Sequence, residues 1–154
     1  MQTSEMKRGA IAGLVAGLVF VVFEMVAMAM MNGSPWGPPR MMAAIAMGEG
    51  VLPPPATFDA AIVAVGMLVH FALSAVIGVV FALGASRMCT SMAHAVISGT
   101  VFGLVVYVVD FYGFTELFPW FAMARNGVTI AAHAIFGAVM GWYYWRSCAV
   151  PVTA

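Results

Sequence analysis

The chain has 154 residues, of which 64% are hydrophobic and only 8% are charged, and its six basic and six acidic residues cancel. Soluble domains carry about 25% charged residues. The composition therefore excludes a soluble protein and predicts one integral membrane domain over residues 1–154. Because the charge is balanced and no polybasic run occurs, nucleic-acid binding is excluded as well.

The first apolar run covers residues 9–31 and comes directly after the basic pair Lys7 and Arg8. At 1.5 Å per residue, its roughly 23 residues cross a hydrocarbon core of ~30 Å. A cleavable signal peptide is the alternative, with 27–29 as its cleavage site. A transmembrane span is favoured, because the run is long for a signal core, contains Glu24 and has a related copy in mid-chain.

Residues 32–59 interrupt the hydrophobicity and contain six of the eight prolines. This external connection is expected to turn at both ends. Between the turns, the run MMAAIAM at 41–47 is too short to span a membrane. It predicts a short interfacial helix on the membrane surface, with Trp36 and Arg40 at the level of the lipid headgroups.

Three further apolar runs cover residues 60–85, 92–113 and 127–145. A polar turn at 86–91 and an aromatic connection at 114–126 separate them. The last run ends in the sequence WYYWR, which is typical of an interfacial aromatic belt with a basic stop after it. The expected fold is an all-α membrane protein with four transmembrane helices.

The basic residues orient these spans. With the N-terminus in the cytoplasm, four basic residues lie inside and two lie outside, as the positive-inside rule prefers. The inside set is Lys7, Arg8, Arg87 and Arg146, and the outside set is Arg40 and Arg125. Both termini are then cytoplasmic. Cys89 and Cys148 fall on the same reducing side, so no structural disulfide is expected.

An internal repeat relates the two halves of the chain. The stretch GLVAGLVFVVFE at 13–24 has a counterpart, GTVFGLVVYVVD, at 99–110. Each copy ends in a carboxylate, Glu24 or Asp110, and a Pro-Trp pair, a His in the next span and an Arg-x-Cys sequence come after it. Chance similarity among small apolar residues is the alternative, but the rarer residues match in order. A duplicated two-helix hairpin is predicted, with repeat 1 at about 9–89, repeat 2 at about 95–148 and a pseudo-twofold axis along the membrane normal.

Helical geometry places the unusual residues on faces that carry small side chains. At about 100° per residue, Glu24 and Asp110 each fall within roughly 40° of the glycines before them. His70 and His133 each share a stripe with small residues that come after them at intervals of four. Small residues at this spacing let helices approach closely. The expected packing residues are Gly13, Gly17, Gly99, Gly103, Ser74, Gly78, Gly137 and Gly141.

Glu24, Asp110, His70 and His133 are therefore expected at helix contacts in the outer half of the bilayer. The twofold relation sets the two histidines opposite each other, and the two carboxylates likewise. A carboxylate at the centre of a transmembrane helix costs about 2.5–3.5 kcal/mol, so these acids need a compensating role.

Three kinds of chemistry suit this cluster. Glu24, His70, Asp110 and His133 could chelate one or two transition-metal ions. His70 and His133 alone could bind a haem as cofactor through its axial positions. Carboxylate and imidazole could instead exchange protons and drive ion movement. Simple acid–histidine pairs that satisfy buried polar groups are the structural alternative.

Methionine is abundant, with 14 residues, and it clusters on the outer side at 28–31 and 41–47. Packing by a flexible side chain is the favoured interpretation of these methionines. Because thioethers select Cu(I), copper is the metal to test first. His94, at the cytoplasmic start of the third span, is interpreted as an interfacial, solvated residue.

Four segments carry a resemblance to a known group of proteins: GSPWGPPRMMAAIAMG, GVLPPPATFD, LVHFALS and FYGFTELFPWFAMARN. They resemble small four-helix proteins of the bacterial inner membrane, some of which are labelled sodium:proline symporters. The resemblance covers most of the chain. It implies the bacterial inner membrane and four spans, and it implies no activity or site residues.

The sequence has no nucleophile–base pair, phosphate loop, HExxH or CxxC motif. We therefore expect no enzyme and no catalytic residues. The expected function is that of an accessory inner-membrane protein whose acid–histidine cluster binds a metal or haem or relays protons, as a homo-oligomer or within a larger complex. The alternatives are a small oligomeric ion or solute transporter with Glu24 and Asp110 as coupling acids, and a purely structural subunit.

Overall fold

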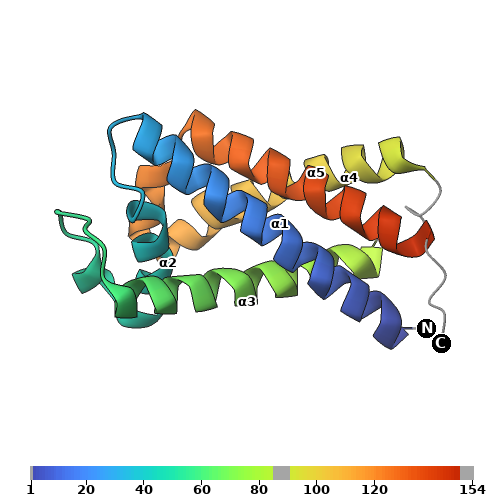
Figure 1. Ribbon diagram of the computed structural model, residues 1–154, viewed down its shortest axis with the longest axis horizontal. Helices are drawn as coiled ribbons and strands as arrows, with labels where there is room; N and C mark the ends of the chain where they lie inside the picture. The colour runs from blue at the N-terminus through green and yellow to red at the C-terminus, as the bar shows by residue number, and fades with distance from the viewer. Residues whose placement is uncertain (1, 85–90, 150–154) are drawn as a thin grey trace.

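The computed structural model describes residues 2–84 and 91–149, and within these ranges it contains helices and connections without strands. Four long helices make up its body: α1 (Gln2–Met30), α3 (Ala60–Gly84), α4 (Met92–Val108) and α5 (Gly127–Ala149). α1 and α4 run toward one end of the bundle, while α3 and α5 run back from it (Figure 1). The chain is thus an up-down-up-down arrangement of helices.

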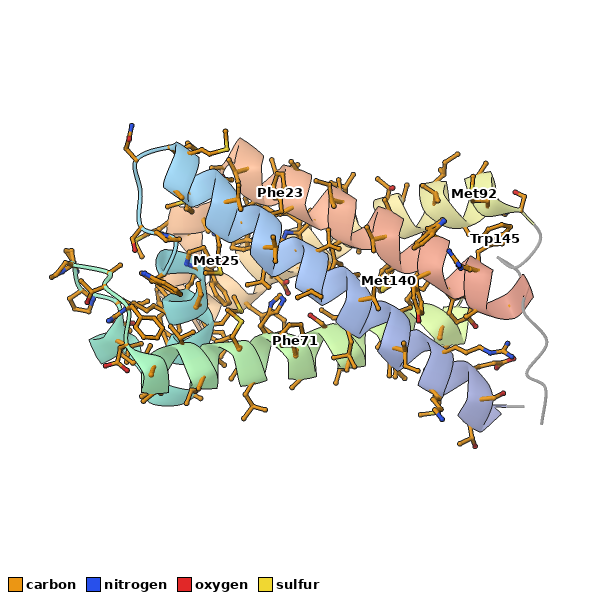
Figure 2. The ribbon with its side chains drawn as sticks, viewed as in Figure 1. Phe23, Met25, Phe71, Met92, Met140 and Trp145 are labelled. Atoms are coloured by element: carbon orange, nitrogen blue, oxygen red, sulfur yellow. The ribbon has the colours of Figure 1, made fainter. Side chains whose placement is uncertain are left out.

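Short elements cover the end of the bundle where α1 stops. They are α2 (Gly37–Met47), three 3-10 turns and one π-helical turn. The 3-10 turns are η1 (Glu49–Val51), η4 (Phe114–Glu116) and η5 (Pro119–Ala124), and the π-helical turn is η3 (Val109–Gly113). We call this the α2 end of the molecule; Figure 2 shows Met92 and Trp145 at the opposite end.

Three stretches of the described residues are long and apolar enough to cross a membrane, namely Thr3–Met30, Ala60–Gly84 and Met92–Glu116. They correspond to the first three predicted spans. α5 has 23 residues but includes His133, Arg146 and an aromatic run, and it is not among these stretches. The fourth span therefore stays a prediction.

Small residues bring the long helices together in two pairs, α1 with α3 and α4 with α5. At the first crossing, a Cβ atom added to Gly13 would overlap the carbonyl of Ser74. At the second crossing, Gly99 and Gly137 each face the carbonyl of the other. All eight small residues of the predicted stripes lie at these crossings: Gly13, Gly17, Ser74, Gly78, Gly99, Gly103, Gly137 and Gly141. The backbones therefore touch directly within each pair.

Side chains, by contrast, join one pair to the other. α1 contributes small residues, and α5 contributes large ones, to a shared buried cluster whose members include Ala12, Ala16, Phe136, Met140 and Tyr144. Met140 is fully buried and lies near the middle of the bundle (Figure 2). The seam between α1 and α5 is therefore the main contact between the two hairpins.

α2 packs on α3, where a Cβ atom at Gly66 would overlap the carbonyl of Pro39. Arg40 is only 9% exposed. Its Nε donates to the carbonyl of Thr57 at 3.0 Å, and its Nη1 donates to that of Val51 at 2.8 Å. The sequence did not predict these bonds, which form because the irregular connection has backbone carbonyls that need donors. The level of Arg40 relative to the lipid headgroups stays a prediction.

Cys148 is disulfide-bonded, which differs from the thiol expected at this position. Spacing and compartment suggested the thiol, but bond formation depends on proximity in three dimensions, which the sequence does not give. Disulfides form in oxidising compartments, so the disulfide of Cys148 favours an end of α5 outside the cytoplasm. The basic residues favour a cytoplasmic position for the same end. Cys89 and Arg87, both expected on the cytoplasmic side, lie outside the described residues.

Candidate functional site

Glu24 lies on α1 and is only 7% exposed. Its polar neighbours on α5 are the hydroxyl of Thr129 and the ring of His133. Within the described part of the chain, its Oε1 atom has no hydrogen-bond partner. A buried oxygen without a partner is costly, especially on an ionised group. Protonation of the carboxyl group or a bound ligand would lower the free-energy cost of burying this atom.

His133, on α5, lies next to Asp110, with Nε2 at 3.6 Å from Oδ2. The other ring nitrogen, Nδ1, is 2.8 Å from the carbonyl oxygen of Thr129. A carbonyl only accepts, so Nδ1 carries a hydrogen and donates it. In the neutral ring, Nε2 then turns a lone pair toward the carboxylate. At this distance the two groups form an ion pair when the imidazole also carries a proton on Nε2.

Asp110 does not lie in a regular α-helix, because α4 ends at Val108 and the chain continues as the π-helical turn η3. Its side chain is 30% exposed. Arg125 supports this turn from outside, since its Nε donates to the carbonyl of Phe111 at 2.7 Å. π-helical turns are rare and are frequent at functional sites. Asp110 is thus the accessible acid of the pair, and Glu24 is the enclosed one.

His70, on α3, is buried at 8% exposure, and its Nε2 donates to the carbonyl of Gly17 on α1 at 2.9 Å. In the neutral ring this leaves Nδ1 unprotonated, and among the described residues Nδ1 has no hydrogen-bond partner. The two histidines therefore bond through different ring nitrogens, although they hold the same position in the predicted repeat.

Phe20 contacts both histidine rings, with ring centroids at 5.5 Å from His70 and 4.9 Å from His133. A haem bound axially by both histidines would need the volume that Phe20 occupies, so these residues do not fit a haem. In the described ranges, no three His, Cys, Asp or Glu side chains form a group that could hold a metal ion. The structure pairs Asp110 with His133, sets Glu24 beside His133, and bonds His70 to Gly17 rather than to any of these three.

A cavity of about 250 Å³ opens beside Glu24 and His70 at the α2 end. Its walls come from α1, α2, α3 and the residues before and at the start of α5. Five methionines line it: Met28, Met41, Met42, Met67 and Met123. Arg40 and Thr129 also line it. We call this space the methionine cavity.

Sequence reasoning missed Phe20, Thr129 and two of the cavity methionines, Met67 and Met123, and it did not place Arg40 at the cavity. Thr129 precedes His133 by four residues, a helical spacing that was available as a signal. Met67 stands one turn before His70 and was likewise detectable. His94 is exposed at the start of α4, and its backbone N–H caps onto Ser91.

No family model, curated protein sequence or solved structure matches this chain. The site is therefore interpreted from its own geometry: one enclosed acid, one accessible acid–histidine pair, and a cavity rich in thioethers that the enclosed acid lines.

Proposed function

We propose that this chain is a non-catalytic integral protein of the bacterial inner membrane that passes protons between Glu24, His133 and Asp110. The observation that supports this most directly is the contact between His133 Nε2 and Asp110 Oδ2 at 3.6 Å, which becomes an ion pair when the imidazole gains a proton. Glu24 is close enough to the same imidazole to interact with it electrostatically. Three titratable groups then form a short chain from a buried carboxylate to a more exposed one.

Each group has a distinct part in this proposal. Asp110, at 30% exposure, exchanges protons with the surroundings. His133 is held by its Nδ1 hydrogen bond to Thr129, so only Nε2 is free to gain and lose a proton. The Thr129 hydroxyl stands next to Glu24, and a hydroxyl both donates and accepts. Protons reach Glu24 through this hydroxyl or directly from the imidazole.

The architecture that goes with this function is a duplicated hairpin with four spans, α5 included. It is supported by the equivalent contacts at the two crossings: Gly13 faces Ser74 where Gly99 faces Gly137. The basic residues place the N- and C-termini in the cytoplasm, although the disulfide of Cys148 favours the opposite placement. A green fluorescent reporter fused after the last residue should therefore fluoresce, whereas a periplasmic alkaline phosphatase in the same place should be inactive; the reverse pattern would overturn this orientation.

A small transporter that works as an oligomer is the second candidate. The methionine cavity favours it, because a space of about 250 Å³ lies beside a buried acid. Such a space can hold a solute or ion whose movement is coupled to protonation of that acid. In that mechanism, Glu24 and Asp110 are the coupling acids.

Infrared difference spectroscopy on the purified protein in lipid tests the proposal. Changing the pH should produce a carbonyl stretching band of a protonated buried carboxyl group. The band should disappear in Glu24→Gln and persist in Glu49→Gln, which changes an exposed acid of η1. Proton uptake into proteoliposomes should likewise be lost in Glu24→Gln and retained in Glu49→Gln. If neither signal responds to Glu24→Gln, the acids and histidines serve only as buried pairs and the protein is structural.

A further inference from the structure

The five methionines of the methionine cavity come from separate parts of the fold. Met28 lies on α1, Met41 and Met42 on α2, Met67 on α3 and Met123 on η5. Four of them are partly buried, and Met123 is 70% exposed. Segments far apart in the sequence therefore bring thioethers to one place.

Packing accounts for part of this convergence, because Met41 and Met42 pack against the buried cluster that contains Ala44 and Phe111. Methionine is used in apolar cores because its flexible side chain fills irregular gaps. Here five methionines are among the residues that line an open space of about 250 Å³. The same cavity is lined by Glu24, whose Oε1 atom is buried and has no hydrogen-bond partner among the described residues. Soft thioether donors and a buried carboxylate are both suited to binding a cation.

The donor set selects the kind of cation. Zinc and iron sites are built from imidazole, carboxylate and thiolate, and the described residues offer no group of three such side chains. Thioethers are soft ligands that favour Cu(I). They are also neutral, so the single charge of Glu24 matches a monovalent ion. The nearby Arg40 disfavours a higher positive charge, although its guanidinium already donates to two carbonyls.

His70 supplies a nitrogen ligand of the right form. A histidine that binds a metal through one ring nitrogen usually donates the other N–H to a carbonyl or carboxylate, which fixes the tautomer. His70 donates Nε2–H to the carbonyl of Gly17 at 2.9 Å, lines the methionine cavity and has its Nδ1 lone pair unused. The bond to Gly17 therefore prepares the ring to bind a soft ion.

We propose that the methionine cavity binds one Cu(I) ion through its thioethers and the Nδ1 atom of His70, with Glu24 as the balancing charge. Binding leaves the ion in its reduced state and breaks no bond in the protein. The site is distinct from the four-residue metal cluster expected from the sequence, because His133 and Asp110 take no part. It goes beyond the proposed proton function, since thioethers bind the ion whether or not Glu24 exchanges a proton with His133.

The test is a binding titration on the purified full chain in lipid nanodiscs. Cu(I), kept reduced by ascorbate without oxygen, competes with a coloured Cu(I) chelator, and Ag(I) serves as a probe that cannot change oxidation state. The cavity variant is Met28→Leu with Met42→Leu. Its matched control is Met30→Leu with Met47→Leu, which changes the same two helices at methionines that are 79% and 45% exposed. Leucine keeps the volume and apolarity of methionine, so both variants should fold.

The wild type and the control should bind one ion per chain, and the cavity variant should lose at least about tenfold in affinity. X-ray absorption of the bound copper should show sulfur neighbours together with a nitrogen that is lost in His70→Phe. Equal loss in both double variants, or no loss in the cavity variant, would overturn the proposal. So would equally tight, stoichiometric binding of Zn(II), because it would mean that thioethers do not form the site.

The two proposals fail separately. The cavity variant keeps Glu24, Thr129, His133 and Asp110, so its infrared carboxyl band should match that of the wild type. Loss of copper binding with an intact band isolates the metal site. A missing band in a wild type that still binds copper refutes the proton function alone.

Discussion

The α1–α3 hairpin and the α4–α5 hairpin cross in the same way but use their polar residues differently. Both crossings bring backbone against backbone through small residues at intervals of four. Yet His70 donates across its crossing to Gly17, whereas His133 donates within its own helix to Thr129. The crossing is thus common to both hairpins, and the hydrogen bonding of the histidine is specific to each.

The residue at one equivalent position, Ser74 in the first hairpin and Gly137 in the second, explains part of this difference. Gly17 faces the side chains of Ser74 and His70, while its counterpart Gly103 faces the backbone carbonyl of His133. In the second hairpin the position of Ser74 is taken by Gly137, which lets the backbones meet at this level. There the imidazole cannot lie between the helices, and it bonds instead along α5 and reaches Asp110.

The acids differ for a related reason. α1 continues as a regular helix to Met30, so Glu24 remains inside the bundle, and one of its oxygens has no partner among the described residues. α4 stops at Val108, and the π-helical turn carries Asp110 toward the surface. A repeated pattern of glycines therefore fixes how the helices pair, while the chemistry depends on how each helix ends.

The largest effect is expected when a methyl group is added at equivalent glycines of the two crossings. Gly13→Ala and Gly99→Ala each bring Cβ onto a facing carbonyl. Each should therefore lower the free energy of unfolding by about 3 kcal/mol. Denaturant unfolding in detergent measures this. Gly113→Ala is the control, because nothing lies within 4 Å of a Cβ there. A loss in only one hairpin would break the equivalence of the crossings.

Removing the enclosed acid should have the opposite sign. Glu24→Leu eliminates a buried oxygen for which the described residues offer no partner, so the protein should become more stable by about 1–2 kcal/mol while losing the infrared carboxyl band. Thermal unfolding of the variant beside the wild type measures the change. A less stable variant would mean that Oε1 is satisfied in the membrane, and that the two acids differ less than their exposure indicates.

Exchanging the residue that distinguishes the crossings sharpens the comparison. Ser74→Gly makes the first hairpin resemble the second and should cost only about 1 kcal/mol, mainly from backbone entropy. Gly137→Ser makes the reverse change and should cost more, because its Cβ would overlap the carbonyl of Gly99. Equal costs would show that Ser74 does not set the difference between the hairpins.

The smallest stability effect is expected at the acid–histidine pair. In Asp110→Asn, the amide N–H can donate to Nε2 of the neutral His133 ring, so no shared proton is needed. Stability should change by no more than about 0.5 kcal/mol. The nitrogen NMR signals of His133 should then stop reporting a shared proton, while those of the exposed His94 stay as in the wild type. An unchanged His133 spectrum would argue against a proton shared by this pair.

The sequence predicted those residues that can be recognised from their near neighbours in the chain. Glycines at intervals of four and an acid or histidine in an apolar run are visible without a structure, and these residues do lie at the crossings and beside them. The π-helical turn at Asp110, the burial of Arg40 and the place of Phe20 between the histidines were not predictable, because each depends on contacts between distant segments. Phe111 of the π-helical turn packs in one cluster with Ala44 of α2. α2 has no counterpart after α4, so the expected twofold relation could not place these side chains.

The direct backbone contacts at the two crossings have a mechanical consequence. Few side chains, such as those of Ser74 and His70, reach between the helices of the first hairpin. The helices of each hairpin therefore have little to rearrange, and sliding one past the other would drive carbonyls into Cα atoms. Each hairpin should therefore move as a rigid body. The seam between α1 and α5 is made of rings and a thioether that can change rotamer, including Phe136, Met140 and Tyr144. Any opening of the molecule would be a rotation of one hairpin against the other about the seam between α1 and α5.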